Sequence, residues 1–559
     1  MQIFNKIHFQ NLKGDLFGGV TAAIIALPMA LAFGVASGAG AEAGLYGAIL
    51  VGLFAALFGG TPTLISEPTG PMTVVITAVI ASLIAADPEN GMAMAFTVVI
   101  LAGLFQILFG FLKLGKYITL MPYTVVSGFM TGIGFILIIL QMAPFLGHGS
   151  PPGGVVGTLE SLPEFISNIQ MQEVTLAALT LAILFLTPSR LKRYLPPQLV
   201  ALVVGTIISL TVFAAMDIRR IGEIPTGLPE FQMPMFTAEQ WQIMLLNAIV
   251  LGMLGCIDAL LSAVISDSLT KQQHNSNKEL IGQGVGNVAS GLFGGLPGSG
   301  ATMGTVVNIQ SGAQTALSGI TRALILLVVV VWAAGLTANI PLAVLAGIAM
   351  KVGMDIIDWK FLKRAHRISF KAAAIMYGVI VLTVFVDLIT AVGIGLFIAN
   401  IMTVRRLSDM QSDDIQTITS PKDASGFFNQ EEMALFERAN GHIILFRLTG
   451  PMIFGSAKAI SRKNIEIQSG DAVILDISEV SHLGVSSSLA IEEAILDNIK
   501  ANRRVYVVGA TGQPLQRLNA LGALEPLPES HIVSERIVAL SNAIDEMEAA
   551  SSSTDSVTT

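Results

Sequence analysis

The feature that most constrains this chain is a near-continuous series of apolar segments from about Asp15 to Val404. Each segment has close to the ~20 residues that an α-helix needs to cross a bilayer. We identify fourteen of them, centred near Ile25, Leu50, Thr77, Leu101, Gly132, Leu181, Val204, Gly255, Val288, Val306, Val328, Leu345, Val379 and Phe397. The sequence therefore predicts an all-α polytopic membrane domain over residues 15–406, after a short N-terminal segment at residues 1–14.

Composition excludes the main alternatives to a membrane protein. Only 13% of the residues are charged and 53% are hydrophobic, whereas about a quarter of the residues in a soluble domain are charged. The net charge of −8 leaves no basic surface for nucleic acid, and a single cysteine, Cys256, excludes a disulfide framework. The sequence also contains no phosphate-binding loop, nucleophile elbow or metal-ligand cluster, so an enzyme is not expected.

The distribution of Lys and Arg predicts which loops face the cytoplasm. Clusters of basic residues follow only even-numbered segments, apart from Arg219 and Arg220, which acidic neighbours outnumber. Because cytoplasmic loops carry an excess of Lys and Arg, both termini are predicted to be cytoplasmic. The clusters are Lys113 and Lys116; Arg190, Lys192 and Arg193; Lys271 and Lys278; Lys360, Lys363, Arg364, Arg367 and Lys371; and Arg405 and Arg406.

The composition changes after Arg406, where the apolar segments end. Residues 407–435 are polar and charged, and we interpret them as a linker. Short β-rich runs then alternate with amphipathic helical stretches such as residues 487–501, which predicts a small cytoplasmic α/β domain over residues 436–548. The β-rich runs are residues 443–448, 472–477 and 505–508. The Ser-rich tail at residues 549–559 is predicted to be disordered.

A short motif occurs once in each half of the membrane region. Residues 57–62 read LFGGTP and residues 292–297 read LFGGLP, and a knot of small residues follows each copy, at 66–71 and 298–302. Coincidence in a chain rich in Gly and Leu is the alternative explanation. Both copies stand at the third segment of seven, and an odd number of segments gives the halves opposite topology. We therefore predict a 7+7 inverted repeat. The repeats would cover about residues 15–215 and 240–405.

The small-residue knots predict two half-helices that begin inside the membrane. A helix that starts there leaves unpaired N–H groups and a partial positive charge at its N-terminus, and two such ends can hold an anion. Thr69 is expected to cap the first half-helix, with Pro71 just inside it, and Ala301 with Thr302 to play the same part in the second. The anion would then bind between these ends, near the middle of the bilayer.

Asp258 lies in the middle of an apolar segment, where an ionised carboxylate is costly unless it is paired or hydrated. Ser262 follows four residues later and so faces the same side of a helix. Together with backbone carbonyls near Gly300, these oxygens suit a small alkali cation. The alternatives are a protonated or helix-capping Asp258, or an aspartate at the end of a misplaced segment. Glu67, before the first half-helix, is interpreted as a local cap.

Several separate motifs stand out along the chain, at residues 27–33, 44–46, 57–60, 67–71, 275–284, 291–295, 308 and 311–312. In this order they resemble the sulfate permease family of anion transporters, and the C-terminal domain resembles the family's STAS domain. The likeness covers nearly the whole chain and is strongest to sodium-dependent bicarbonate transporters within the family. It implies core and gate domains, with the substrate between the third and tenth helices, and dimers that associate through the STAS domains.

The resemblance also implies which residues bind the two substrates. Bicarbonate would bind at Thr69, Gly300, Ala301 and Thr302, and sodium would bind at Asp258, Ser262, Gly300 and Thr302.

Two positions depart from the family pattern. Many relatives carry an arginine where this chain has Gly304, so the anion site here would depend on helix dipoles alone, beside a carboxylate that repels the anion. A bound Na⁺ would neutralise Asp258, which makes sodium coupling the expectation. In the C-terminal domain, residues 476–487 resemble a phosphorylatable loop, but Gly484 stands in place of the usual Asp and weakens the case for Ser486 as a regulatory site.

The resemblance thus implies a low-affinity, high-flux, sodium-dependent symporter that imports bicarbonate across the plasma membrane, the inner membrane of the cell, by alternating access. Its expected partners are bicarbonate, Na⁺ as the coupling ion, membrane lipid and a second copy of the chain, with no cofactor. The second hypothesis is a proton-coupled sulfate or dicarboxylate permease in which Asp258 carries the proton. A nucleobase transporter of the same fold and a membrane scaffold or sensor are weaker alternatives, because nucleobase sites usually offer carboxylates and a scaffold needs no broken helices.

Overall fold

The structure is a computed structural model whose chain divides into two units, Met1–Ile398 and Ala399–Thr559. Each unit is described by itself. The residues that the structure describes are 4–5, 7–118, 122–188, 196–222, 229–332, 334–386, 390–391, 394–395, 397–398, 400–405, 415–424, 426–453, 455–465 and 470–555.

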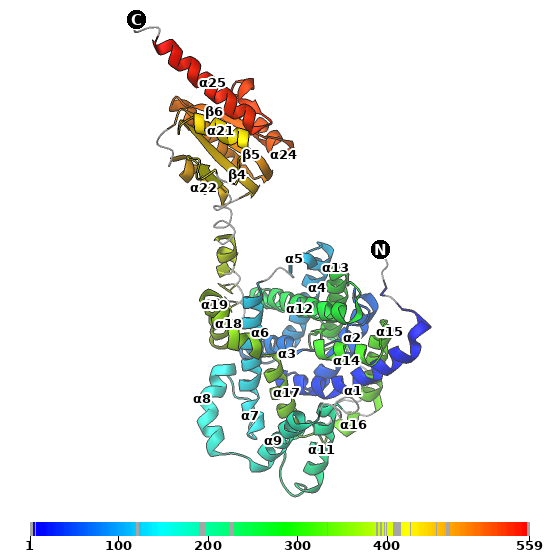
Figure 1. The fold of residues 1–559 in the computed structure, drawn as a ribbon. Coiled ribbons are helices and arrows are strands. Elements are labelled where there is room, and N and C mark those ends of the chain that lie inside the picture. The colour runs from blue at the N-terminus through cyan, green and yellow to red at the C-terminus, as the bar shows by residue number, and fades with distance from the viewer. Residues whose placement is uncertain are drawn as a thin grey trace. The chain divides into compact units, whose positions relative to one another are not determined.

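The first unit is a bundle of helices interrupted by one two-stranded ribbon (Figure 1). Every predicted segment centre from Ile25 to Val379 lies in one of its helices, and the last, near Phe397, falls in a stretch that is described only in part. The helices are α1 (Leu12–Ser37), α2 (Ala41–Phe58), α3 (Gly70–Ala86), α4 (Gly91–Phe111), α5 (Gly115–Ile118), α6 (Tyr123–Leu140), α7 (Met142–Phe145), α8 (Gly154–Ser167), α9 (Met171–Leu186), α11 (Pro197–Thr211), α12 (Trp241–Thr270), α13 (Ser276–Leu292), α14 (Thr302–Gln310), α15 (Leu317–Trp332), α16 (Ala334–Thr337), α17 (Leu342–Ile356), α18 (Trp359–Ile368) and α19 (Phe370–Phe385).

The lengths of these helices show that the unit is built for a membrane. Among the described residues, five helical segments are long and apolar enough to cross one, or six if α8 and α9, which meet at 115°, form a single broken span. The five segments are Phe9–Ser37, Ala41–Phe58, Gly91–Phe111, Tyr123–Phe145 and Trp241–Thr270. By contrast, α14 has only 9 residues, or about 14 Å at 1.5 Å per residue, which is half the thickness of the hydrocarbon core.

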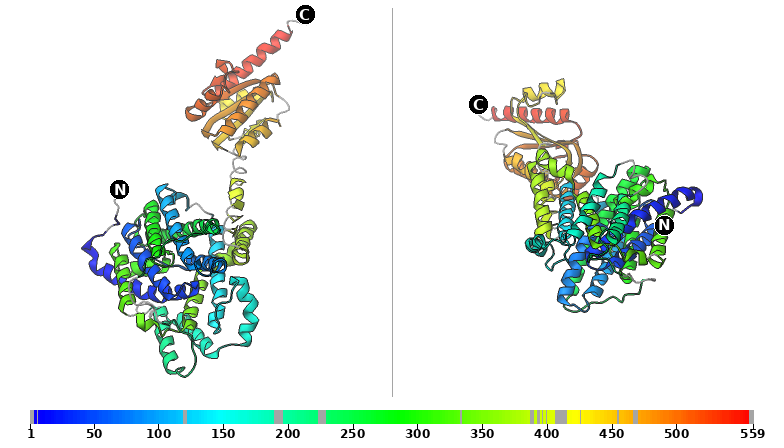
Figure 2. Two further views of the ribbon diagram at one scale, coloured as in Figure 1. Left: turned by 180° about the vertical axis from the view of Figure 1, so that it is seen from behind. Right: turned by 90° about the horizontal axis from the view of Figure 1, so that it is seen from below.

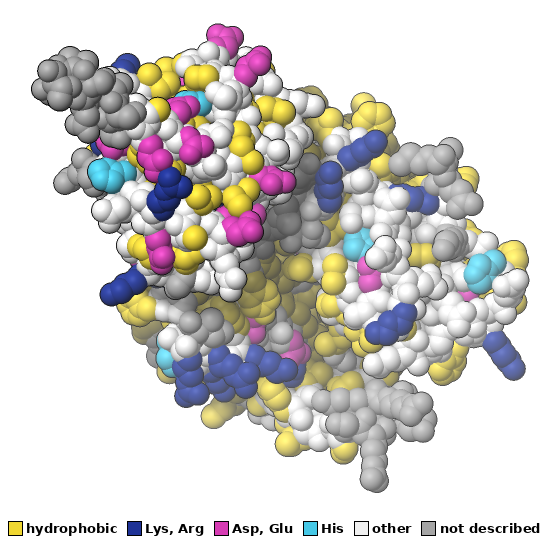
Figure 3. Space-filling model, turned by 45° about the horizontal axis from the view of Figure 1, so that its top comes forward, with side chains coloured by type: hydrophobic (Ala, Val, Ile, Leu, Met, Phe, Trp, Pro, Cys, Tyr) yellow, Lys and Arg dark blue, Asp and Glu magenta, His cyan; other side chains and the backbone are white. Residues whose placement is uncertain are grey.

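Large apolar side chains on the helix surfaces support the same conclusion. Leu186, Trp332 and Phe370 are each more than three-quarters exposed, with relative accessibilities of 78%, 86% and 84%. Figure 3 shows many further hydrophobic side chains on the surface, and several Lys and Arg side chains form one dense group among others that are scattered. Exposed large apolar side chains such as these three are more stable in contact with lipid than with water.

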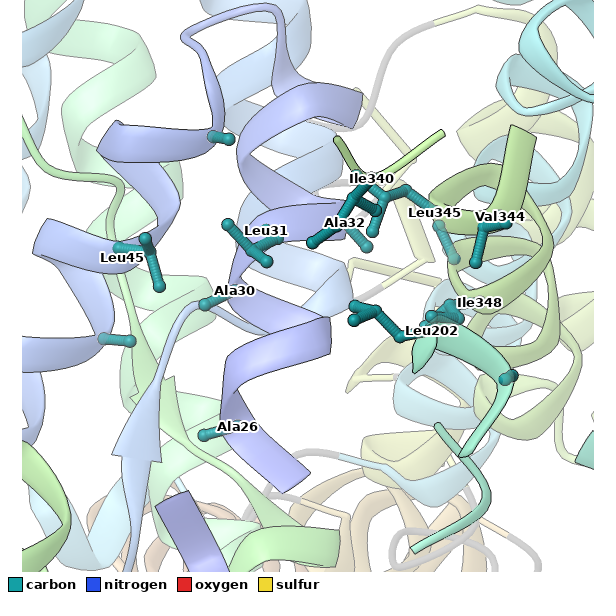
Figure 4. Close-up of a cluster of buried hydrophobic side chains, with 14 of the residues drawn as sticks. Ala26, Ala30, Leu31, Ala32, Leu45, Leu202, Ile340, Val344, Leu345 and Ile348 are labelled. Atoms are coloured by element: carbon teal, nitrogen blue, oxygen red, sulfur yellow. The ribbon is translucent and has the colours of Figure 1, made fainter. Parts of the chain in front are cut away.

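Figure 2 shows the ribbon from behind and from below. A cluster of buried alkyl groups packs α1 against α2, α11 and α17 (Figure 4). Leu31 of α1 lies at its centre and is fully buried, and Leu45, Leu202 and Val344 contribute from the other three helices. Much of the α1 contribution is alanine, so the helices approach closely. Small side chains are typical of helix contacts within membranes, where packing rather than water exclusion holds helices together.

One close helix contact in the unit uses glycine on both sides. A Cβ atom added to Gly103 of α4 would lie 2.6 Å from the carbonyl oxygen of Gly284 in α13, and the reverse substitution would bring a Cβ within 2.5 Å of the Gly103 oxygen. No side chain fits at either position. These glycines fix α13, which precedes the second small-residue knot, against α4.

The second unit is a five-stranded sheet with helices on both faces (Figure 1). The strands are β3 (Ile415–Ile418), β4 (Ile443–Met452), β5 (Ala472–Leu483), β6 (Arg504–Val508) and β7 (Ile532–Val533), in that order, with β3 antiparallel and the others parallel. The helices are α21 (Gln430–Arg438), α22 (Ser456–Ile465), α23 (Val485–Lys500), α24 (Gly512–Leu521) and α25 (Arg536–Asp555).

Alternation along β5 assigns the two faces of this sheet. Val473 and Leu475 pack with α22, α23 and α24, whereas Ala472 and Ile474 pack with α21 and α25. A strand buried on both sides is expected in a parallel sheet that helices cover. The three predicted β-rich runs are therefore confirmed as β4, β5 and β6, and the predicted helix at residues 487–501 is confirmed as α23.

Secondary structure extends past both predicted ends of this domain. Residues 407–435 were predicted to be a linker, but β3 and the first residues of α21 lie within them, because β3 completes the sheet edge beside β4. Part of that linker, residues 407–414 and 425, lies outside the described residues. The predicted disordered tail begins at Ala549, yet α25 continues to Asp555. Its apolar residues Ala539, Leu540 and Ala543 are buried against the sheet, which anchors the helix before it extends past Ala549.

Candidate functional site

A two-stranded ribbon joins the two small-residue knots. Strand β1 (Ser66–Glu67) pairs antiparallel with β2 (Ser299–Gly300), so that Ser66 lies opposite Gly300 and Glu67 opposite Ser299. The backbone N–H of Ala301 donates a further hydrogen bond of 2.7 Å to the carbonyl of Ile65. The backbone polar groups of these non-helical segments are thus paired with each other, as burial inside a membrane protein requires.

Helices α3 and α14 begin directly after this ribbon, with Thr69 and Ala301 as their N-cap residues. Because β1 and β2 run in opposite directions, the two helices leave the ribbon in opposite directions while their N-terminal ends stay close together. No described side chain caps either end. Each end therefore presents N–H groups and a partial positive charge to the space between them. Thr302 and Met303, at the start of α14, are exposed, which leaves this space accessible.

Asp258 approaches the helix ends from α12. Its Oδ2 atom accepts a hydrogen bond of 2.8 Å from the hydroxyl of Thr69 and a short one from the hydroxyl of Ser299. The side chain is buried, and among the described residues it has no ion pair. A carboxyl group held only by hydroxyl groups has no counter-charge beside it, so a cation or a proton can neutralise it.

Ser262 stands one turn further along α12 and contacts the other knot. Its hydroxyl donates 2.7 Å to the carbonyl of Gly300 and lies 2.9 Å from the hydroxyl of Thr302. Carboxylate, hydroxyl and carbonyl oxygens from three separate segments therefore gather beside the helix ends. Hard oxygen ligands of this kind suit Na⁺ and do not suit softer metal ions.

A buried ion pair supports the ribbon from behind. Arg322 of α15 is fully buried and pairs with the carboxylate of Glu67. Its Nη1 atom also donates to the carbonyls of Ser66, at 3.0 Å, and Ala48, at 3.1 Å. Because Arg322 and Glu67 neutralise each other, the pair adds no net charge to the site. It does hold β1 in place.

Every residue predicted to bind bicarbonate or sodium lies in this one region. Thr69 and Asp258 are hydrogen-bonded to each other and both contact the hydroxyl of Ser299, whereas Ser262 contacts the carbonyl of Gly300 and the hydroxyl of Thr302. Thr69 is the N-cap residue, as predicted, but its hydroxyl donates to Asp258 instead of capping its own helix. Glu67 is not a local helix cap, because its carboxylate binds Arg322.

Sequence reasoning missed Ser299 and Arg322. Ser299 was visible only as part of a small-residue knot, and nothing local predicted that the ribbon would aim its hydroxyl at Asp258. Arg322 was easier to find, since an arginine inside the apolar segment Leu317–Trp332 is costly and therefore marks a functional or structural partner.

The predicted regulatory residue, Ser486, lies in the second unit. It is exposed in the first turn of α23, and Gly484 is the N-cap residue of that helix. The segment compared with a phosphorylatable loop is mostly strand, because β5 runs as far as Leu483. The carboxylate of Asp476 at its start is bound by the Ser478 hydroxyl and by Arg536.

Comparison with known proteins shows which families and relatives the chain matches. The family model described as the sulfate permease family matches residues 12–379, and the STAS domain model matches residues 437–534. The bicarbonate transporter BicA of Synechocystis sp. is 64% identical over 544 residues, which cover 97% of this chain and 96% of that protein.

Among the solved structures that are similar to the chain are the following two. One, described as the transmembrane domain of a cyanobacterium bicarbonate transporter BicA, has a TM-score of 0.67 and 72% sequence identity and covers 70% of this chain and all of that one. The other, described as the overall structure of SLC26A9, has a TM-score of 0.81 at 18% identity and covers 97% of this chain and 92% of that one. The second likeness shows the fold, that of a helical membrane transporter with a C-terminal STAS domain.

Proposed function

The chain belongs to the sulfate permease family, and from that premise we propose that it is a low-affinity, high-flux bicarbonate transporter that couples HCO₃⁻ import to Na⁺. The relative from Synechocystis sp. is named a bicarbonate transporter, and the likeness to it extends over almost the whole of both chains. The named relatives are transporters, and no enzymatic activity is proposed.

One observation carries the proposal. Asp258 lies in the middle of a 30-residue apolar helix, has hydroxyl groups as its partners, and is joined by the Thr69 hydroxyl to the N-terminus of α3. Opposite charges are thus arranged side by side, with a negative group for a cation and two helix N-termini for an anion.

Electrostatics explains why the anion would require the cation. Two unit charges about 5 Å apart interact by about 3 kcal/mol at an effective dielectric constant of about 20. A bare Asp258 carboxylate would repel bicarbonate by this amount, which corresponds to a loss of roughly a hundredfold in affinity. Na⁺ at Asp258 removes that repulsion. Because coupling between two ligands is reciprocal, bicarbonate should raise the affinity for Na⁺ by the same factor.

The proposed cation ligands are Asp258, Ser262, Gly300 and Thr302, and the proposed anion ligands are Thr69, Gly300, Ala301 and Thr302. An anion between the helix ends would receive N–H groups and the hydroxyl of Thr69, and Thr302 would contribute its hydroxyl to either ion.

The proposal includes an arrangement of the whole chain. Fourteen segments would form a 7+7 inverted repeat in the plasma membrane, with both termini in the cytoplasm. The antiparallel pairing of β1 with β2 supports opposite topology of the halves, since it relates α3 to α14 by an approximate half-turn. Transport would proceed by alternating access, and two copies of the chain would associate through their STAS domains.

A proton-coupled sulfate or dicarboxylate permease is the second candidate. The same carboxylate favours it, because Asp258 with hydroxyl partners can bind H⁺ in place of Na⁺. The residues are the same, and only the coupling ion and the anion differ.

Uptake of radiolabelled bicarbonate into proteoliposomes, with and without an inward sodium gradient, tests the proposal. We expect uptake that depends on Na⁺ and that labelled sulfate does not reproduce. Uptake that follows a proton gradient and is indifferent to Na⁺ would support the second candidate instead.

A further inference from the structure

Three polar residues on α12 form a line that leads away from the candidate cation site. Asp258, Ser262 and Ser266 are spaced four residues apart, so they lie on one face of the helix, about 6 Å apart along its axis. Relative accessibilities of 8%, 0% and 1% place all three in the interior. Each of them contacts oxygen atoms of a facing segment.

The third position of this line repeats the chemistry of the first two. The hydroxyl of Ser266 lies 2.8 Å from the hydroxyl of Thr63, which is also buried and precedes β1. The second position has the carbonyl of Gly300 and the hydroxyl of Thr302, and the first has the hydroxyls of Thr69 and Ser299. A series of hydroxyl and carbonyl oxygens thus follows α12 from the middle of the helix toward its C-terminal end.

The line ends at a polar cavity of about 350 Å³. Thr63 and Ser266 line part of this cavity, and Asp267, Thr270 and His274 line it as well. The Nδ1 atom of His274 lies 2.7 Å from Oδ2 of Asp267, which is a quarter exposed. The cavity lies at the end of α12 from which the loop with Lys271 leaves, the loop predicted to be cytoplasmic. A carboxylate therefore stands at each end of the hydroxyl series.

We propose that Thr63 and Ser266 form a second, transient site for a monovalent cation, through which Na⁺ passes between Asp258 and this cavity. The proposal rests on the function proposed above, since it gives the route of the same ion. Oxygen atoms at regular intervals can replace the hydration shell of a cation as it moves, which is how channels conduct ions through narrow filters. The anion would use the separate opening beside Thr302 and Met303.

The competing explanation is that the Thr63–Ser266 contact only holds two segments together. Hydroxyl pairs do serve this purpose in membrane proteins. That role would need neither the polar cavity next to the pair nor an alignment with Asp258 and Ser262. The two explanations differ in their kinetic consequences.

The decisive experiment is sodium-dependent bicarbonate uptake by proteoliposomes that contain full-length Ser266→Val. The variant places a branched alkyl group on the route. We expect the maximal uptake rate to fall by about tenfold or more, as for the loss of an oxygen ligand to a charged group, while the half-saturating Na⁺ concentration changes less than about twofold. Ser268→Val, an exposed position two residues away on the same helix, is the matched control and should match the wild type.

Thr63→Val keeps the test valid if Ser266→Val does not fold. Valine has nearly the shape of threonine, so this substitution removes the hydroxyl and little else, and we expect the same loss of maximal rate. Thr175→Val, which removes an exposed hydroxyl from α9, is its control. Uptake by Thr63→Val or by folded Ser266→Val at the rate of its control would overturn the route.

Failure of the route is distinguishable from failure of the proposed function. If the proposed sodium coupling is wrong, uptake by the wild type itself does not respond to Na⁺. If only the route is wrong, the wild type responds to Na⁺ and Ser266→Val behaves like Ser268→Val.

Discussion

The hydroxyl of Thr69 donates a 2.8 Å hydrogen bond to Oδ2 of Asp258, across 189 residues of sequence. Thr69 belongs to the candidate anion site and Asp258 to the candidate cation site, so the two sites share one hydrogen bond. A hydroxyl group has a single proton, so Thr69 cannot donate to Asp258 and to an anion at once. A cation bound to Asp258 would weaken the carboxylate as an acceptor and free that proton. The contact therefore offers a direct link between cation and anion binding.

The first prediction concerns Asp258→Asn. We expect the variant to fold and to lose sodium-stimulated uptake, because the amide keeps the shape and one acceptor oxygen but removes the only full negative charge proposed for the cation site. Uptake measured across a sodium titration checks this. Asp87→Asn, in the exposed turn where Asp87 binds the N–H groups of Glu89 and Asn90, is a matched control and should keep the wild-type response. An unchanged sodium half-saturation in Asp258→Asn would show that the cation binds elsewhere.

The second prediction concerns the shared hydroxyl. Thr69→Ala removes a hydrogen bond to a charged ligand, which is worth about 1.5–3 kcal/mol, so the half-saturating bicarbonate concentration should rise roughly ten- to hundredfold. Thr69→Ser keeps the hydroxyl and should restore most of the affinity. Bicarbonate titrations of both variants at saturating Na⁺ provide the measurement. Equal losses in the two variants would assign the effect to the methyl group of Thr69 rather than to its hydroxyl.

The site and the fold were predictable from the sequence to different degrees. Asp258 and the paired knots around Thr69 and Ala301 could be located from the sequence. A carboxylate in an apolar segment and small polar residues before a short helix are energetically unfavourable within a membrane, so they indicate a functional site. The contact between Thr69 and Asp258 could not be predicted, since it depends on how β1 and β2 pair across the two halves of the chain.

The C-terminal unit shows a different limit of sequence reasoning. Its central strands have a strong apolar signal and were correctly predicted. Strand β3 has only four residues, and its side chains alternate between buried and more exposed, so it could not be separated from the polar sequence before it. The extent of α25 was also missed, because residues 549–555 continue a helix whose anchoring contacts are made earlier, by Leu540 and its neighbours.

The third prediction concerns the ion pair between Arg322 and Glu67. Arg322→Met should destabilise the protein by about 3–5 kcal/mol, since it leaves a buried carboxylate and the carbonyls of Ser66 and Ala48 without their donor. The double variant Arg322→Met with Glu67→Gln should recover part of this loss. Unfolding of the wild type, Arg322→Met, Glu67→Gln and the double variant in mild detergent gives the double-mutant cycle. An interaction energy near zero would show that the pair does not act as a unit.

The fourth prediction concerns the oligomeric state. Truncation after Arg406 should leave a membrane-inserted protein that elutes as a monomer in mild detergent, because the proposed dimer contact lies in the STAS domain and the helical unit has its own buried core. Size-exclusion chromatography with light scattering checks this against the full-length chain. A truncated protein that still elutes as a dimer would place the contact in the helical unit.

The last prediction concerns Gly304, the position at which the resemblance to the family leads us to expect an arginine in many relatives. A Cβ atom at this position would lie 3.4 Å from Oε1 of Glu67 and 3.1 Å from Cγ2 of Ile65, so a side chain fits there only if Ile65 moves slightly. Glu67 is already neutralised by Arg322, and an arginine at 304 therefore adds one uncompensated positive charge beside the anion site. At about 5 Å this charge offsets the repulsion from Asp258 by about 3 kcal/mol, which is the role proposed for Na⁺.

We expect Gly304→Arg to transport bicarbonate without Na⁺, at a reduced maximal rate because of the altered packing. Gly304→Met, with a long uncharged side chain, should lose rate in a similar way and keep its full dependence on Na⁺. If the two variants respond identically throughout a sodium titration, charge compensation does not explain why this chain would need Na⁺.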